Sequence, residues 1–402
     1  MTRAHCLFCN GTNLDKIIDL GIQPLADTFI TLDMVDERDA RYPLQCTQCR
    51  DCKGVQTTYV VSPGERYCAA DYSYTSSNSR LSREYWDAYA AEAMELYDIS
   101  EGDLVIEIGS NDGYLLEQFK NAGARVLGID PSMYVNDLAN KRGVRTITAL
   151  FDDTVAEYVL STYGRPKLVI ANNVFNHSNE PKEFMDGISH LIDENSTFVC
   201  ESPYWLNCIK SGRFDQIYHE HVFYFTAKTM EFLSSYCGLV ISQIGETYYH
   251  GGSLRCTMRA CGKVIPKVQE MIAEEERFGL YELKTYRNFM RHLYEQKDDF
   301  REQVRAIKEA GGSILAVGAA AKGNTLLTFY ELDRSIIDLV TDASPHKQGK
   351  MTPLTRIPIT ADSAFAEYDE PYAIILSWNI SDVLKEILHK INPKIKFLDL
   401  PE

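Results

Sequence analysis

The stretch "DQIYHEHVFYF", residues 215–225, gathers several side chains that can carry or accept a proton near neutral pH. Tyr218, His219, Glu220 and His221 are consecutive in it, although the whole chain has nine histidines. A histidine tuned near neutrality can act as a general base, and a tyrosine or second histidine can hold an oxyanion. A metal site on the two histidines is the alternative, but no third ligand is adjacent in sequence. The residue types leave a proton-transfer site, a metal site and a polar turn all open at this point.

Cysteines with regular spacing mark the N-terminal part of the chain. Cys6 and Cys9 form one Cys-x-x-Cys pair, and the run "CTQCRDC" offers two registers for a second, Cys46 with Cys49 or Cys49 with Cys52. Two such pairs about 40 residues apart predict a tetrahedral zinc site that is closed and therefore structural. Metal binding would supply folding energy that so short a module lacks.

A glycine turn in "VIEIGSNDGYLL" follows an apolar run and precedes a helical pattern. It contains Gly109, Asn111 and Gly113, with Glu107 just before it and Asp130 at the end of the next apolar run. An acid in Asp130's position accepts hydrogen bonds from ribose hydroxyls. An acid at 107 suits a cationic amino-acid head group, whereas it would repel a pyrophosphate. Together the two acids favour S-adenosylmethionine as the cofactor.

Short apolar runs alternate with helical stretches in two parts of the chain. The first set lies at 104–109, 125–130, 168–172 and 197–202, and the second at 313–318, 336–342 and 373–378. Alternation of this kind predicts doubly wound parallel sheets. We expect an α/β protein with a zinc-binding domain (1–70), a Rossmann-like cofactor domain (71–262) and a Rossmann-like C-terminal domain (263–402).

Charge and hydropathy narrow the possible partners and the compartment. The net charge of −16 argues against a nucleic-acid or anionic-membrane partner, because both require a basic face. The chain has no apolar run of 18 residues and no signal peptide at its start, so we expect a cytoplasmic protein. Its eleven cysteines are then expected to be thiols and not disulfides.

Several longer motifs resemble the S-adenosylmethionine-dependent C-methyltransferases that act on nucleotide-activated deoxysugars. The resemblance covers nearly the whole chain, and its motifs are the cysteine pairs, "LGIQPLADTF", "EIGSNDGYLL", "NNVFNH", "YHEHVFYF", "HGGSLR", "GAAAKGNTLL" and "SPHKQGKMTPLTRIPI". It implies that residues 71–262 form a methyltransferase domain. It also implies that the zinc ligands are Cys6, Cys9, Cys49 and Cys52, with Cys46 in place of an aliphatic residue.

The resemblance further implies a reaction and the residues that perform it. A ketone at C4 acidifies the hydrogen on C3 of a sugar, and removing that hydrogen gives an enolate that can attack a methyl group. His221 maps to the general base, and Tyr218, Glu220, His177 and Tyr72 complete the catalytic set. This chemistry needs no metal, and His219 is expected to be structural, on the opposite face from His221. His177 also follows the strand-like run 168–172, where open α/β sheets build their sites.

Cofactor and substrate contacts are assigned on the same grounds. Asn173 joins Glu107, the glycine turn and Asp130 around the cofactor. Lys322 and Asn324 occupy a small-residue strand-to-helix turn typical of anion sites. With Lys347 and Asn173 they are the predicted contacts of a nucleoside-diphosphate 4-keto-deoxysugar. Departures from the family pattern are Leu354, where the family has glycine, and Ser377, where it has proline.

Three other functions share part of this pattern. An O- or N-methyltransferase on the same sugars would differ only in the acceptor atom. A nicotinamide-dependent sugar dehydrogenase or epimerase would lack Glu107 and carry a Tyr-x-x-x-Lys pair, and a zinc-ribbon interaction protein would not need His177 and His221. The sequence leaves the nucleotide and the exact sugar open, and we expect a monomer or a weak homodimer.

Overall fold

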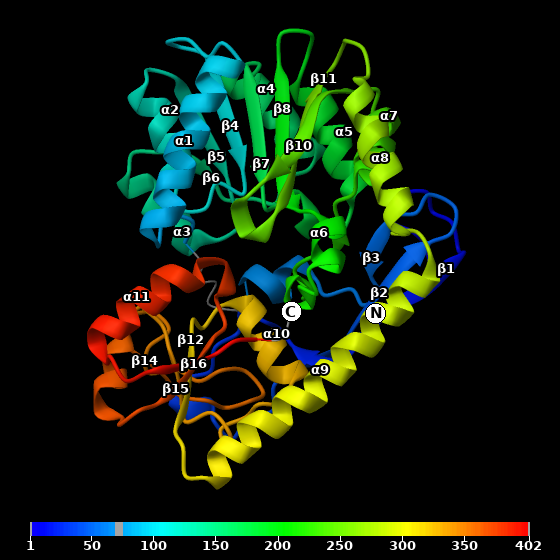
Figure 1. Ribbon diagram of the computed structural model, residues 1–402. Coiled ribbons are helices and arrows are strands. Elements are labelled where there is room, and N and C mark those ends of the chain that lie inside the picture. Colours follow the sequence, from blue (N-terminus) through cyan, green and yellow to red (C-terminus); the bar gives the residue numbers. More distant parts are fainter. Residues whose placement is uncertain (1, 69–74, 401–402) are drawn as a thin grey trace.

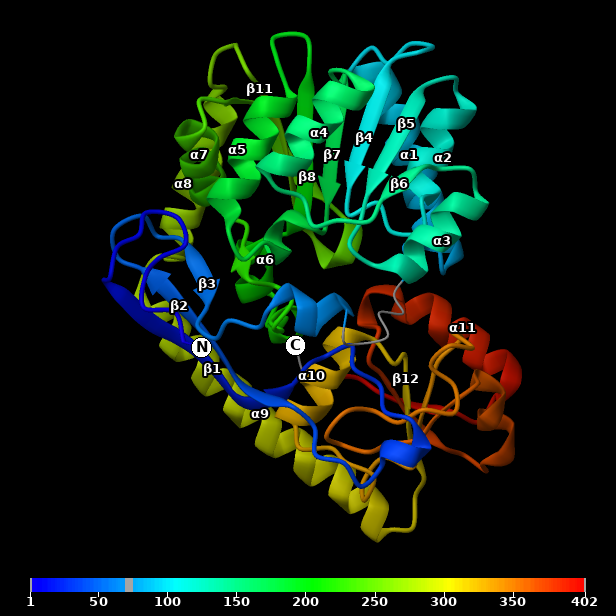
Figure 2. The same cartoon turned by 180° about the vertical axis from the view of Figure 1, so that it is seen from behind.

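The computed structural model describes residues 2–68 and 75–400, which form three β-sheets with their covering helices. The seven-stranded central sheet lies at one end of the molecule and the C-terminal sheet at the other, with the cysteine-containing module beside both (Figures 1 and 2). The predicted fold class, an α/β protein with a small N-terminal module and two Rossmann-like sheets, is confirmed. In the described part of the chain, no helix has both the length and the apolar composition needed to cross a membrane.

The N-terminal module is a four-stranded antiparallel sheet in the order β1-β2-β3-β9. Its own strands are β1 (Leu14–Pro24), β2 (Arg41–Cys49) and β3 (Val55–Thr57), with the short helical turns η1 (Leu32–Met34) and η2 (Gly64–Cys68). The fourth strand, β9 (Phe223–Tyr224), comes from the middle of the chain, and Val55 pairs with Tyr224. The histidine-containing stretch is therefore anchored to the cysteine module by backbone hydrogen bonds.

The central sheet has seven strands in the order β10-β11-β8-β7-β4-β5-β6. The strands are β4 (Leu104–Ile108), β5 (Arg125–Ile129), β6 (Thr146–Ile147), β7 (Leu168–Asn172), β8 (Thr197–Pro203), β10 (Val240–Thr247) and β11 (Ser253–Arg259). Neighbours from β8 to β6 are parallel, while β11 is antiparallel to both β8 and β10. Every residue of β4, β7 and β8 is buried, as expected for strands covered on both faces.

Helices cover both faces of the central sheet. One face carries α1 (Arg80–Leu96), α2 (Tyr114–Asn121) and α3 (Met133–Lys141). The other carries α4 (Asp153–Tyr163), α5 (Pro181–Leu191) and α7 (Ala227–Tyr236). The short helical segments η3 (Phe175–His177), α6 (Trp205–Lys210), η4 (Phe214–Gln216) and η5 (Tyr249–Gly251) lie in the loops that follow β7, β8 and β10.

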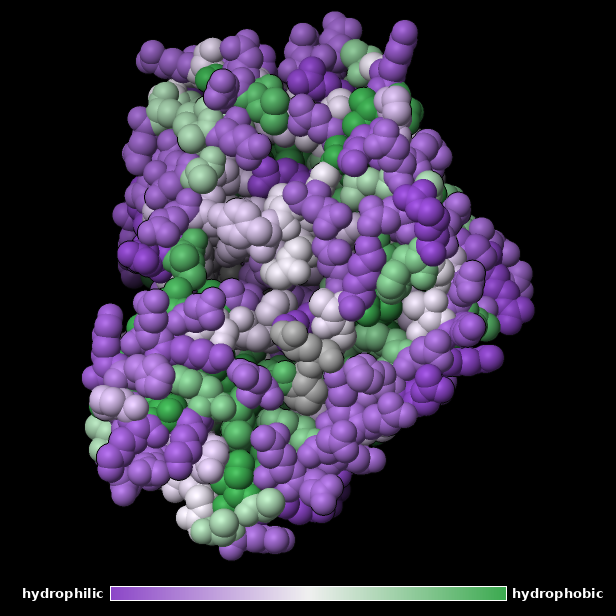
Figure 3. Space-filling view, viewed as in Figure 1, coloured by the Kyte–Doolittle hydropathy of each residue, from purple (hydrophilic) through white to green (hydrophobic). Residues whose placement is uncertain are grey.

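Two helices connect the central and C-terminal sheets. α8 (Pro266–Phe278) packs on α7 and β10, and α9 (Leu283–Glu309) then runs diagonally past β1 to the C-terminal domain (Figure 1). α9 has 27 residues, which makes it about 40 Å long. Its buried residues recur at helical spacing, and its outer face is hydrophilic (Figure 3).

The C-terminal sheet is entirely parallel, in the order β14-β13-β12-β15-β16. Its elements are β12 (Ile314–Val317), α10 (Ala321–Phe329), β13 (Leu339–Thr341), β14 (Ile359–Thr360), η6 (Asp362–Glu367), β15 (Tyr372–Ile375), η7 (Trp378–Ile380), α11 (Ser381–Ile391) and β16 (Lys396–Leu398). The strand order reverses between β12 and β15, which is where open α/β sheets bind ligands.

The N-terminal module also contacts the C-terminal domain directly. Ile30 and Met351 exchange two backbone hydrogen bonds, of 3.0 and 2.7 Å. Nearby, Arg356 Nη1 lies 2.6 Å from a carboxylate oxygen of Asp39. The N-terminal module is thus held by both larger domains.

Candidate functional site

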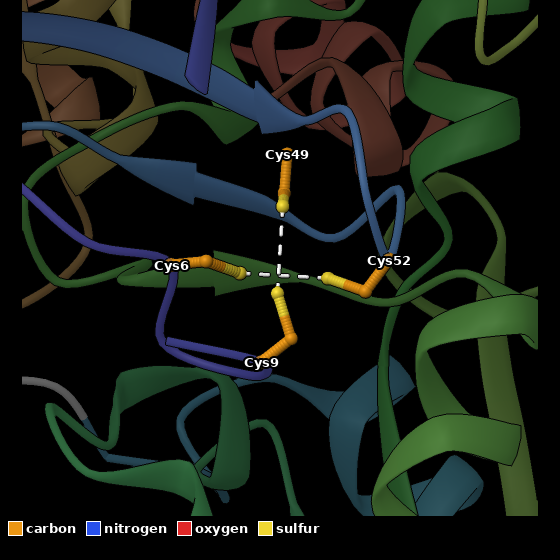
Figure 4. A group of neighbouring side chains, drawn as sticks. All are labelled: Cys6, Cys9, Cys49 and Cys52. Atoms are coloured by element: carbon orange, nitrogen blue, oxygen red, sulfur yellow. Dashed lines mark hydrogen bonds between the residues drawn. The ribbon is translucent and has the colours of Figure 1, made fainter. Parts of the chain in front are cut away.

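The four cysteines Cys6, Cys9, Cys49 and Cys52 form a compact cluster, and their sulfur atoms all lie within 4.8 Å of one another. Their side chains point to a common centre from two loops (Figure 4). The closest sulfur pairs are 3.4 Å (Cys6 with Cys52) and 3.5 Å (Cys9 with Cys49). Zinc–sulfur bonds of about 2.3 Å in a tetrahedron place sulfurs about 3.8 Å apart, so the cluster fits zinc with small adjustments.

The two loops that carry these cysteines share one backbone geometry. Asn10 donates to the Cys6 carbonyl and Lys53 to the Cys49 carbonyl, each at 3.0 Å. Both donors have a left-handed backbone, with φ of 61° and 66°. Cys46 lies outside the cluster, fully buried in β2, and burial raises the pKa of its thiol to about 12. Of the two registers, the structure gathers the one with Cys49 and Cys52.

A cavity of about 320 Å³ opens at the carboxyl ends of β4, β5 and β7. The predicted cofactor residues Glu107, Gly109, Asn111, Asp130 and Asn173 all line it. Gly113 is not among the lining residues and begins α2 with φ 75°.

Backbone conformation explains the residue types in the glycine turn. Gly109 has φ 71°, and a Cβ at this position would lie 2.6 Å from the Val174 side chain. Asn111 and Asn173 adopt φ of 50° and 54°, a left-handed region that non-glycine residues rarely occupy and that clusters at functional sites. The Asn111 N–H donates to Asp130 Oδ2 at 3.0 Å, which fixes the turn against the second strand.

Polar atoms around the cavity fit the groups of S-adenosylmethionine. Among the described residues, Glu107 Oε2 and Trp86 Nε1 are buried without a hydrogen-bond partner. Burial, with the charges of Asp112 and Asp130, raises the pKa of Glu107 well above its usual range. A cationic ligand group beside Glu107 would restore its ionised form. Burial raises the pKa of Asp130 to about 6, and hydrogen bonds from ribose hydroxyls would favour its ionised form.

The predicted catalytic residues meet where this cavity approaches the histidine-containing stretch. The His221 ring centroid lies 4.0 Å from that of Tyr218 and 5.1 Å from that of His177, and His177 also lines the cavity. His221 Nδ1 lies 2.7 Å from the carbonyl of Gln216 and donates to it, which leaves Nε2 as the acceptor. Burial lowers the pKa of His221 to about 4, so the ring is neutral at physiological pH.

Two further polar residues of this region, Glu220 and Arg66, are buried. Burial and the nearby charge of Asp27 raise the pKa of Glu220 to about 8, which favours the protonated acid at neutral pH. Arg66 Nη1 donates to the carbonyls of His177 and Glu220 at 3.1 and 3.3 Å. No sequence pattern had pointed to Arg66, because its partners are more than 100 positions away.

The sequence predicts a structural role for His219, and its contacts agree with that role. His219 turns away from His221, with Nε2 3.3 Å from the Pro43 carbonyl and its ring against Tyr42. Tyr72, predicted to be catalytic, lies outside the described residues.

The predicted substrate residues of the C-terminal domain have different surroundings. Lys322 Nζ lies 4.6 Å above the Trp378 ring and donates to Asn379, and burial lowers the pKa of its ammonium to about 8. Asn324 is buried and donates to the carbonyl of Ala26 at 2.5 Å.

Lys347 is buried as well, and its ammonium group contacts other parts of the fold. Its Nζ donates to the Ala319 carbonyl at 2.6 Å and lies 5.0 Å from the Phe29 ring centroid. Lys322, by contrast, has a second cation nearby, because Arg213 lies on the same tryptophan at 4.3 Å from the ring centroid. Arg213 stands two positions before the "DQIYHEH" stretch and had not been singled out.

Comparisons with known proteins agree with this architecture. Family profiles match a zinc binding domain at residues 6–67, a methyltransferase domain at 80–243 and a C-methyltransferase C-terminal domain at 248–397. The C-methyltransferase NovU of Streptomyces niveus is 32% identical over 395 residues, which cover 96% of this chain and 93% of that protein.

Solved structures that resemble the chain include two methyltransferases. Magnesium protoporphyrin IX methyltransferase of Synechocystis PCC 6803 is 16% identical with a TM-score of 0.34, over 44% of this chain and 78% of that one. A S-adenosylmethionine-dependent methyltransferase of Clostridium acetobutylicum is 14% identical with a TM-score of 0.36, over 45% and 92%. The identity and coverage of the Streptomyces relative, together with the three matched domains, show that the chain belongs to the family of S-adenosylmethionine-dependent sugar C-methyltransferases.

Proposed function

We propose that this C-methyltransferase methylates C3 of a nucleotide-activated 4-keto-deoxysugar through an enolate formed by His221. The observation that carries the proposal is the hydrogen bond from His221 Nδ1 to the Gln216 carbonyl, 2.7 Å long. It holds a neutral imidazole with Nε2 available beside a cavity suited to the cofactor. A positioned base of this kind contributes about 10²- to 10⁴-fold to proton abstraction.

The neighbours of His221 supply the groups that an enolate requires. Negative charge develops on the C4 oxygen when the C3 proton leaves, and preorganised donors stabilise it. The Tyr218 hydroxyl is the donor we assign, with His177 and Glu220 as the other polar groups of this site. Burial raises the pKa of Glu220 to about 8, so at neutral pH its carboxyl group can donate. Tyr72 remains a predicted member of the set.

The cavity residues are assigned to the cofactor and the sugar. S-adenosylmethionine supplies an electrophilic methyl group when bound. Glu107 would face the cationic amino-acid end of the cofactor and Asp130 the ribose, with Gly109, Gly113 and Asn111 shaping the turn between them. Asn173, at the end of β7, lies where cofactor and sugar would meet.

The C-terminal domain is assigned to the nucleotide part of the substrate. Lys322 and Arg213 place two cations on one tryptophan ring at the reversal point of the parallel sheet, which suits a diphosphate. Lys347 and Asn324 are assigned to the walls of this region, since both donate to backbone carbonyls. The proposed compartment is the cytoplasm, where a reducing environment would keep the cysteine cluster available for zinc.

The decisive experiment is hydrogen exchange at C3. A panel of thymidine, guanosine and cytidine diphosphate 4-keto sugars is incubated in heavy water with the enzyme and S-adenosylhomocysteine, and deuterium at C3 is followed by NMR. His221→Asn should lose about 10²- to 10⁴-fold in exchange while still binding both ligands. The matched control is His219→Asn, which removes the neighbouring imidazole that faces Pro43 and should retain exchange.

The pH dependence of exchange adds a second test. Because burial lowers the pKa of His221 to about 4, the base stays unprotonated from pH 8 down to about 5. The exchange rate should therefore be level from about pH 7 down to about 5, fall below this range as His221 is protonated, and fall near pH 8 as the Glu220 carboxyl group ionises. Methylation of an oxygen, or the absence of C3 exchange with every sugar, would contradict the proposal.

A further inference from the structure

Trp378 lies at the carboxyl end of the C-terminal sheet but forms its closest contacts with the central domain. Its Nε1–H donates to a carboxylate oxygen of Asp215 at 2.5 Å. A Cβ on Gly251 would lie 2.2 Å from its ring, so the loop after β10 packs directly on the indole. Figure 1 shows the segment after α6 descending from the central domain towards α10, and η4, which lies in this segment, contacts α10.

Asp215 belongs to the same turn that holds the general base. It lies within η4, and the next residue, Gln216, accepts the 2.7 Å hydrogen bond from His221 Nδ1. The Gln216 side chain donates to the carbonyl of His250 at 3.1 Å, which joins the turn to the loop that Trp378 packs against. Asp215, Gln216 and His221 are all at most 5% exposed, so little solvent is available to replace these bonds.

The cations proposed to bind the diphosphate surround the same indole. Arg213 and Lys322 lie 4.3 and 4.6 Å from the Trp378 ring centroid, and Arg213 is two residues before Asp215. An anion bound between Arg213 and Lys322 would affect the position of the Trp378 ring. Through Arg213 it would also affect the turn that contains Asp215. The nucleotide end and the reacting end of the substrate therefore contact one continuous segment of chain.

We propose that Trp378 is a positioning residue that couples the nucleotide-binding end of the site to the general base His221, acting through Asp215 and the Gln216 carbonyl. This inference rests on the proposed function for its catalytic consequence. The part that concerns structure alone is that the Trp378 N–H fixes the orientation and tautomer of His221, and this part does not depend on which sugar is the substrate. Placement errors of about 1 Å can cost on the order of a hundredfold in rate, so one bond of this kind can control the reaction.

The first test needs no sugar substrate. The full-length enzyme is labelled with ¹⁵N-histidine, bound to S-adenosylhomocysteine, and the His221 ring nitrogens are assigned with His221→Asn. Wild type should show the Nδ1–H tautomer, whereas Trp378→Phe should show mixed tautomers and an imidazole pKa closer to the ordinary value. The matched control is Trp205→Phe, which loses a buried indole bond of 2.9 Å to Tyr286 and should leave the His221 signals unchanged. An unchanged His221 spectrum in Trp378→Phe would overturn the proposal.

The second test separates positioning from loss of stability. Trp378→Phe and Asp215→Ala should each lower kcat for C3 exchange by about 10- to 100-fold, with the KM for the cofactor unchanged. The double variant should be no slower than either single variant, because both remove the same connection. Asp215→Asn keeps a carbonyl acceptor and should restore the rate, and additive losses would refute the coupling.

The two tests also distinguish the inference from the proposed function. Altered His221 signals without C3 exchange in any sugar would reject the substrate and retain the role of Trp378. Exchange that needs His221 but not Trp378 would retain the substrate and reject the positioning role.

Discussion

In both α/β domains an aspartate follows the second parallel strand and accepts the same two backbone hydrogen bonds. Asp130, after β5, accepts from Asn111 N and Ser132 N at 3.0 and 2.9 Å. Asp342, after β13, accepts from Ala319 N and Ser344 N at 2.7 and 2.8 Å. The carboxyl edges of the two sheets are therefore structural counterparts, although the sequence alone does not establish this.

The two edges differ in what surrounds the aspartate. Asp130 lines the 320 Å³ cavity, together with Glu107, whose Oε2 is buried without a partner in the described chain. In the C-terminal domain Lys347 donates to the Ala319 carbonyl at 2.6 Å, and the cation fills the corresponding region. The same local topology thus leaves polar atoms unpaired around Asp130, whereas around Asp342 a lysine side chain bonds to the turn.

The largest expected effect is a loss of cofactor affinity when Asp130 is replaced by alanine. Asp130→Ala should weaken S-adenosylhomocysteine binding about a hundredfold, since ribose hydroxyls stranded without an acceptor cost about 1–3 kcal/mol each. Asp342→Ala removes the same two backbone acceptor contacts and is the matched control, with affinity unchanged. Calorimetric titration measures both, and equal losses would remove the distinction between the two edges.

An intermediate effect is expected at Lys347. Lys347→Met keeps the length of the side chain but leaves the buried Ala319 carbonyl without this donor, which should cost about 1–3 kcal/mol of unfolding free energy. Urea denaturation measures the loss, and cofactor affinity should not change. A raised KM for the nucleotide sugar at unchanged stability would instead show that Lys347 binds the diphosphate, as its motif had suggested.

The smallest effect tests a departure from the family pattern at the C-terminal edge. Leu354 stands where the resemblance leads us to expect glycine, and its backbone is left-handed with φ 60°. This conformation costs a non-glycine residue about 1–2 kcal/mol, partly offset by the greater chain entropy of glycine. Leu354→Gly should therefore raise stability by up to about 1 kcal/mol in thermal unfolding. A lower Tm would show that the leucine side chain contributes more packing than its backbone costs.

Local spacing predicted the parts of the site that are local in the chain. Cys-x-x-Cys pairs, the turn around Gly109 and the acid at Asp130 each follow from a few neighbouring residues, and the structure places them as the patterns indicate. Even so, the choice of Cys49 and Cys52 needed the family resemblance, because both registers have the same spacing. Cys46 lies inside β2 and outside the cluster, whereas Cys49 is the last residue of that strand and begins the turn that carries Cys52.

Contacts between distant segments could not be predicted in this way. Trp378 and Asp215 are 163 positions apart, and Asn324 meets the Ala26 carbonyl across 298. Nothing in the composition of either segment marks its partner. Lys347 has the residue type of a diphosphate contact, and only the structure shows that its ammonium group is buried and donates to the Ala319 carbonyl.

β9 makes the proposed general base, His221, part of the cysteine module as much as of the central domain. His221 precedes by two residues the strand Phe223–Tyr224, which completes the sheet containing β2 and β3, and the Val222 carbonyl accepts from Thr57 N at 2.9 Å. Zinc binding and the ordering of the base are then thermodynamically linked, because the metal stabilises the sheet on which β9 forms. A chain that has not acquired its metal should hold the cofactor without being able to abstract a proton. The reaction would then be restricted to chains in which the cysteine cluster has bound its metal.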